Sequence, residues 1–270
     1  MEKLQTGVAT NLDFIKAMKE KGQTVDAKFP AETLAKQLTN VGDNNITMVT
    51  PYEEVLENVN SESSGPEEPV EVNDENSLKE AISGGAKSIT LADNIEVPTG
   101  NLDLGQVTEF NGNGKTITFN STGQNLVSTN SCTIENVVVS NTSGSTGEWN
   151  STYGIQCYNG DYIVRNCTVN GCNGGILVNS STVTLEGTID VSDNKFGGIE
   201  VSKSSILERH SILNINGASL VNTTEEYGKP TIWTDGEGNT VNGAESLYQN
   251  ASVKENQVQY YLDESNSVQE

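Results

Sequence analysis

The side chains that most often carry out catalysis are scarce in this sequence and lie apart. Among its 270 residues there is one histidine, His210, and the two arginines are Arg165 and Arg209. Because neighbouring residues of a strand point to opposite faces, Arg209 and His210 would not share one site. Asp190 and Asp193 are a candidate pair of cation ligands, although Asp is also an ordinary turn residue. We therefore expect no catalytic residue, no metal and no cofactor.

Four cysteines offer a second kind of chemistry. Cys132, Cys157, Cys167 and Cys172 have no CxxC spacing, and the histidine is not near them in the sequence. Zinc sites usually combine such pairs of ligands, so a zinc site is the weaker alternative. Cysteines in strand-like segments behave as small apolar residues, and a reducing cytosol keeps them as thiols. The prediction is four structural thiols in a β-rich core.

Arg165 has acidic counterparts at equivalent places in the sequence. Four charged residues directly follow an apolar residue, in the pairs Ile134–Glu135, Val164–Arg165, Leu185–Glu186 and Leu207–Glu208. If the apolar residues point inward, the charged residues form an outward column in which Arg165 lies between Glu135 and Glu186. Such a column is a set of ion pairs across neighbouring strands. A structural role then accounts for the arginine.

Aromatic side chains surround a long loop at residues 141–153. Trp149, Tyr153, Tyr158 and Tyr162 are candidates for stacking on sugar rings, because Trp and Tyr combine an apolar ring with a polar group. The alternative is that these rings pack the base of the loop. The sequence thus predicts a glycan-contacting surface on this flank, with internal packing as the competing interpretation.

A repeat of short strands must position all of these residues. Gly154-Ile155, Gly175-Ile176 and Gly198-Ile199 are separated by 21 and then 23 residues, and the second strands of each pair follow at 21 and 22. A period near 22 residues with small polar turns is typical of a parallel β-solenoid. We expect about seven right-handed rungs over residues 88–240, with Ile155, Ile176 and Ile199 stacked inside. Antiparallel pairing of 176–178 with 183–185 would contradict this prediction.

Three regions divide the chain. Residues 76–270 carry the strands, beginning with a helix over Ser77–Ser83 that has a capping box of Ser77 and Glu80 and ends at Gly84; residues 256–264 should supply a closing strand. Residues 43–75 are an acidic linker, since 43–78 contain ten acidic residues and no Lys or Arg.

Residues 1–42 predict two short helices, 10–22 and 29–42, which are too small to form a core alone. Their apolar faces predict a contact surface for the same chain, for sister chains or for a different protein; it is formed by Phe14, Ile15, Met18, Phe29, Leu34 and Leu38.

Charge separates the same regions. Residues 1–42 have six lysines and five acidic residues, whereas the rest of the chain has nine basic and 32 acidic residues. An acidic surface repels nucleic acid and anionic membranes, so we expect neither as a partner. The N-terminal segment lacks the apolar stretch and cleavage site of a signal peptide, and we expect no membrane segment.

Two segments resemble known families. "SLKEAISGGAKSITLADNIEV" resembles the entry of right-handed parallel β-helices of the pectate-lyase-like superfamily, in which a helix precedes the first rung. The resemblance covers about residues 76–245 and implies that fold, a mostly β right-handed parallel β-helix. The N-terminal "GVATNLDFIKAMKEKGQTVDAKFPAETLAKQL" resembles the capsid-docking modules of bacteriophage head fibre proteins.

The second resemblance implies a function and a place for the protein. We expect a non-enzymatic head fibre or decoration protein on the capsid surface of a virion, synthesised in the host cytoplasm. Its expected partners are a capsid protein of the same virion, sister copies in a homotrimer, and host or mucus glycans. Because one fold serves many functions, a polysaccharide-degrading lyase or glycoside hydrolase is the alternative.

Overall fold

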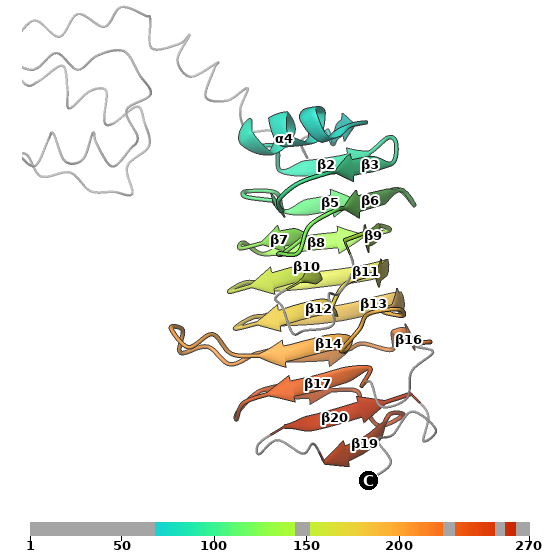
Figure 1. The fold of residues 1–270 in the computed structure, drawn as a ribbon. Helices are drawn as coiled ribbons and strands as arrows, with labels where there is room; N and C mark the ends of the chain where they lie inside the picture. Colours follow the sequence, from blue (N-terminus) through green and yellow to red (C-terminus); the bar gives the residue numbers. More distant parts are fainter. Residues whose placement is uncertain (1–67, 144–151, 224–229, 252–256, 263–270) are drawn as a thin grey trace, which may run out of the picture. The chain divides into compact units, whose positions relative to one another are not determined.

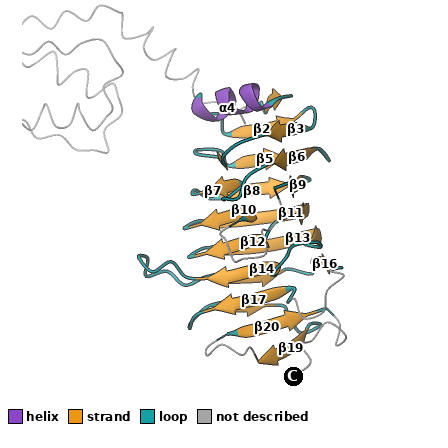
Figure 2. Cartoon of the chain, in the orientation of Figure 1, coloured by secondary structure: helices purple, strands orange, loops and turns teal. Residues whose placement is uncertain are grey.

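A computed structural model of the protein describes residues 68–143, 152–223, 230–251 and 257–262. These residues belong to one structural unit, Gly65–Glu270. Within them the chain is mostly β, with two sheets and the helix α4, Glu75–Ser83 (Figures 1 and 2). The predicted helices of residues 1–42, and with them the six predicted capsid-contact residues, lie outside the described residues.

The two sheets share the strands unequally. Sheet A has 12 strands, which are β1 Val70–Val72, β2 Ser88–Leu91, β3 Ile95–Val97, β5 Glu109–Asn111, β6 Thr116–Phe119, β8 Cys132–Glu135, β9 Val138–Asn141, β11 Asp161–Asn170, β13 Thr182–Asp190, β15 Ile212–Ile215, β16 Ser219–Val221 and β18 Thr240–Asn242. Sheet B has 8 strands, which are β4 Leu102–Asp103, β7 Leu126–Ser128, β10 Tyr153–Tyr158, β12 Gly174–Asn179, β14 Gly197–Ser202, β17 Ile232–Asp235, β19 Tyr248–Ala251 and β20 Val258–Tyr261.

Parallel pairing joins each strand to the equivalent strand of the next repeat. In sheet B, Ile155 pairs with Ile176, and Ile176 pairs with Ile199. In sheet A, Val164 pairs with Ile134 on one side and with Leu185 on the other. The predicted parallel stacking is therefore confirmed, and residues 176–178 pair with strands of sheet B rather than with 183–185. Antiparallel pairing among the described strands occurs where β20 joins β17 and β19.

One continuous hydrophobic core takes side chains from both sheets. The stacked Ile155, Ile176 and Ile199 are fully buried, as predicted, and so are Phe110 and Phe119 nearer the start of the sheets. Every second side chain of a strand points into this core, because successive residues of a strand point to opposite faces. The other side chains of each strand are left to form the outer faces of the two sheets.

Tight bends interrupt the strands of sheet A at matching places. Asn136 and Asn166 adopt left-handed backbone conformations, with φ of 54° and 50°. Gly187 has a φ of 66° in the next repeat. Asn tolerates this conformation better than other residues with side chains do, and here its amide also bonds across the stack: Asn166 Nδ2 donates to Asn136 Oδ1 over 3.2 Å.

The first strands differ from the prediction in two details. The capping box of α4 is formed by the N-cap residue Asp74 and by Ser77 at the third helical position, so the predicted box of Ser77 and Glu80 is wrong. The strand β1 lies within residues 43–75, expected to be a linker, and buries Val72. The predicted end of the helix at Gly84 is confirmed, and Leu78 places the helix on the core.

The later strands bring one correction. Ile215, not Leu207, pairs with Leu185, so Leu207–Glu208–Arg209 is not the next member of the repeat. Residues 203–211 instead form the connection between β14 and β15, and Ile206 within it is 81% exposed. The predicted closing strand is present as β20, with Tyr261 fully buried.

Candidate functional site

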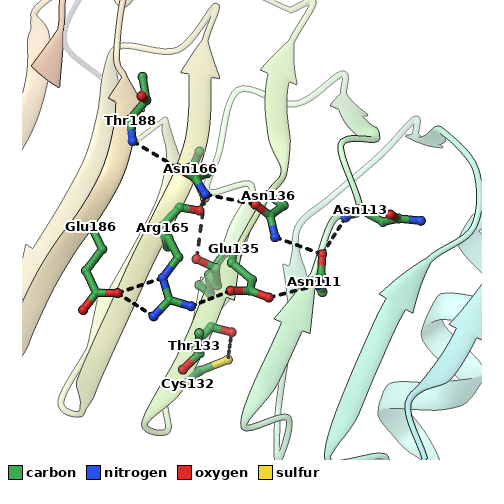
Figure 3. Close-up of polar contacts among 12 residues, drawn as sticks. Asn111, Asn113, Cys132, Thr133, Glu135, Asn136, Arg165, Asn166, Glu186 and Thr188 are labelled. Atoms are coloured by element: carbon green, nitrogen blue, oxygen red, sulfur yellow. Dashed lines mark hydrogen bonds and ion pairs between the residues drawn. The ribbon is translucent and has the colours of Figure 1, made fainter. Parts of the chain in front are cut away.

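The outer face of sheet A carries the predicted ion-pair column. Arg165 donates through Nε to Glu186 Oε2 over 2.7 Å and through NH1 to Glu135 Oε2 over 2.8 Å. Glu135 also accepts from Asn111 Nδ2 over 2.9 Å. Figure 3 shows the guanidinium lying between the two carboxylates, beside the row of asparagines. Glu208 is not part of this column, because it lies in the connection between β14 and β15 and not in a strand of sheet A.

These contacts give Arg165 a structural role. The pKa of Arg165 is raised by its hydrogen bond and charge interaction with Glu186 and then by those with Glu135. The guanidinium stays protonated at every ordinary pH, and its donors point at protein carboxylates. An arginine that abstracts a proton would instead need surroundings that lower its pKa. Nothing in this geometry activates Arg165 as a base.

The outer face of sheet B differs from that of sheet A in holding aromatic and buried polar side chains. One row runs in register across four strands: Gln156, Leu177, Glu200 and Trp233. A second row beside it contains Tyr158, Asn179, Ser202 and Asp235. We call these two rows, with Tyr153, the B face. It is the candidate functional site.

Glycines allow the aromatic rings of the B face to lie against the strands. A Cβ atom on Gly174 would come within 2.4 Å of the Tyr153 ring, and one on Gly197 within 2.8 Å of the Trp233 ring. The Tyr153 hydroxyl donates to Glu200 Oε2. Burial, followed by the charge of Glu200, raises the pKa of Tyr153 well above its usual value. Tyr153 therefore stays protonated and holds the Glu200 carboxylate in place.

Two amide oxygens of the B face have no hydrogen-bond partner. They are Gln156 Oε1 and Asn179 Oδ1, on neighbouring strands of neighbouring rows. Gln156 is 8% exposed. A buried polar atom without a partner costs free energy comparable to a lost hydrogen bond. Each of these oxygens keeps an unused acceptor, and each is itself buried.

The predicted sugar-stacking residues occupy different environments. Tyr162 is 3% exposed, belongs to the main core and donates to the carbonyls of Ser128 and Tyr158. Tyr153 is 3% exposed and packs with Leu177 and Trp233. Both rings are thus too buried to stack on a sugar, which corrects the prediction for them. Tyr158 is partly exposed, and Trp149 lies outside the described residues.

The remaining candidates for chemistry are structural. The four cysteines are free and buried, as expected for core thiols, and burial raises the pKa of Cys132 to about 12. Asp190 accepts the Ser192 N–H and Asp193 has a φ of 58°, which are properties of turn residues. The described residues contain no group of three or more His, Cys, Asp or Glu side chains that could hold a metal ion.

Arg209 and His210 do not share a site. Arg209 pairs with Asp161 and donates to Thr182 Oγ1, the first residues of β11 and β13. The His210 ring lies against Gly238.

No helix in the described part of the chain is long and apolar enough to cross a membrane. Comparison with known proteins found no matching family, no matching curated protein and no matching solved structure.

Most residues of the B face were not predicted from the sequence. Gln156, Glu200 and Trp233 each directly follow an isoleucine of the inner stack, namely Ile155, Ile199 and Ile232. The aligned Gly-Ile pairs therefore contained the signal for an outward row. The pattern did not indicate that this outward row, Gln156, Leu177, Glu200 and Trp233, is buried.

Proposed function

We propose that this protein is a non-enzymatic head fibre or decoration protein of a bacteriophage virion. Residues 1–42 would dock on a capsid protein and associate with sister copies in a homotrimer. The mostly β part would form a right-handed parallel β-helix that projects from the capsid and adheres to host or mucus glycans.

The pairing of Arg165 with Glu135 and Glu186 carries the non-enzymatic part of the proposal. These three charged side chains bind one another across three strands of sheet A, which is what a stiff stem requires. The resemblance of the N-terminal segment, and the near-neutral charge of residues 1–42 beside an acidic remainder, support a docking module joined to such a stem.

The direct test is whether the protein is on a particle. Purified virions of the phage that encodes this chain, separated on a density gradient, should contain it at constant stoichiometry with the major capsid protein, and antibody labelling should mark the head. A protein found only in the lysate and absent from intact virions would contradict the proposal.

A polysaccharide-degrading enzyme is the second candidate, and one observation favours it. Glu200 and Asp235 are both carboxylates on the B face, on adjacent strands and one row apart. Pairs of carboxylates hydrolyse glycosidic bonds. Release of reducing ends from a polysaccharide by the full chain, abolished in Glu200→Gln and in Asp235→Asn, would support the enzyme and overturn the non-enzymatic proposal.

A further inference from the structure

We propose that the B face binds uncharged glycans and rejects glycans that carry uronic or sialic acid. This inference rests on the glycan adhesion proposed above and names the class of sugar that the site takes. It departs from what the resemblance to pectate-lyase-like proteins would suggest, since a pectate-type ligand is a polyanion.

Sheet B carries negative charge, and this is the first reason to expect that it rejects acidic glycans. Its eight strands, which the structure describes, contain three carboxylic acids, Asp103, Glu200 and Asp235, and no Lys, Arg or His. Glu200 and Asp235 lie on the B face itself. Two carboxylates on one face repel a carboxylate of a ligand, and the repulsion is stronger where water is partly excluded.

The arginines that could bind an acidic sugar are occupied elsewhere. Arg165 is held by Glu135 and Glu186 on sheet A, and Arg209 is held by Asp161. Bidentate recognition of a carboxylate usually requires such a guanidinium. The described strands of the B face offer none.

The polar groups of the B face fit hydroxyl donors instead. Gln156 Oε1 and Asn179 Oδ1 lack donors. The exposed Asp235 lies in the same row as Asn179, two strands farther along the sheet, and its Oδ1 accepts from Gln257 Nε2 over 3.0 Å. Sugar hydroxyls, which neutral and acidic sugars both carry, donate to such acceptors, so these oxygens support glycan binding while the two carboxylates provide the discrimination against acidic sugars. The partly exposed Tyr158 ring borders the same row and supplies an apolar surface for a sugar ring.

The experiment uses the full chain on an array of immobilised oligosaccharides. Each neutral oligosaccharide is printed beside a counterpart that carries a uronic or sialic acid. We expect binding to neutral members and at least about tenfold weaker binding to their acidic counterparts. Asp235→Lys should narrow this difference by bringing acidic counterparts into the bound set, and Tyr158→Ala should weaken the binding of neutral members.

A matched control separates this site from the net charge of the protein. Glu237 is exposed and lies just beyond β17, off the B face, so Glu237→Lys makes the same change of charge and should leave the selectivity unchanged. Equal binding of acidic and neutral members by the unaltered protein would overturn the inference alone. No binding to any glycan on the array would contradict the proposed adhesion, and the inference with it.

Discussion

Individual polar residues on the outer face of sheet A are satisfied mainly by one another. Asn111, Glu135, Arg165 and Glu186 form one chain of hydrogen bonds across four strands. Each contact joins residues more than 20 positions apart in the sequence, and each lies at the surface, where ion pairs contribute little singly. Their combined effect is to hold neighbouring repeats in one register.

Replacement of Arg165 tests this role. Arg165→Gln should lower the melting temperature by a few degrees at most, because the pair is partly exposed and screened by solvent, and it should leave glycan binding unchanged. The double variant Arg165→Gln/Glu186→Gln should recover part of the loss, since it removes the repulsion left between Glu135 and Glu186. Thermal unfolding measured by circular dichroism decides this, and a complete loss of a polysaccharide-cleaving activity in Arg165→Gln would restore a catalytic role.

The bends of sheet A give a second prediction at single residues. Gly187→Ala should destabilise the protein by about 1–3 kcal/mol. Alanine is strained at the φ of 66° that Gly187 adopts, and its Cβ would lie 2.0 Å from Asn166 Oδ1, which is a steric clash. Gly217 has a similar φ of 70°, but a Cβ added there would have nothing within 4 Å, so Gly217→Ala should cost less. Urea unfolding of both variants measures the difference, and equal losses would show that the Asn166 contact contributes nothing.

At the scale of elements, the helix α4 covers the start of the core. Its Leu78 side chain is fully buried, whereas β1 beside it has Val70 42% exposed. The capping box fixes where this helix starts: Asp74 Oδ1 accepts the Ser77 N–H over 2.7 Å. Anions are favoured at a helix N-terminus, so the charge of Asp74 matters for this element.

The pH dependence of stability follows from that contact. The hydrogen bond from the Ser77 backbone lowers the pKa of Asp74 in the folded protein, so the carboxylate contributes stability above its unfolded pKa of about 3.9. The contribution is lost as the pH falls through the folded pKa. Melting temperatures of the unaltered protein and of Asp74→Ala should therefore differ at pH 7, and the difference should shrink progressively as the pH falls below about 4. Glu80→Gln on the same helix is the charge control, and a difference as large at about pH 2.5 as at pH 7 would contradict the prediction.

At the scale of the whole molecule, composition divides the chain more sharply than any single motif does. The sequence has a net charge of −22, while residues 1–42 are close to neutral. The described strands have their own continuous core, so we expect them to be stable without the first 42 residues.

Deletion of residues 1–42 tests the division. The shortened protein should remain soluble and melt within a few degrees of the full chain, since the described core is unchanged, but it should no longer join phage particles. Calorimetry and a particle-binding assay give the two measurements. Undiminished binding to particles would place the anchor in another part of the chain.

The sequence predicted much of the fold because stacking in register puts equivalent residues of successive repeats side by side. Spacings of 21 and 23 residues were enough to pair Ile155 with Ile176 and Ile199, and the same alignment paired Arg165 with its two carboxylates. The error at Leu207 has a simple cause. "SILERH" has the apolar pattern of a strand, but residues 203–211 form a connection, and the partner of Leu185 comes later, at Ile215.

The sequence by itself determined which side of a strand a residue takes, because alternation is a property of the extended backbone. Tyr162 lies two residues from the inward Val164, and this alternation alone indicates the burial that the structure shows. Only the tertiary structure decided how the B face is arranged. The hydrogen bond from Tyr153 to Glu200 joins residues 47 positions apart. No local pattern encodes such a contact, because it depends on how many strands lie between the two residues and on the glycines that let the aromatic rings lie against the strands.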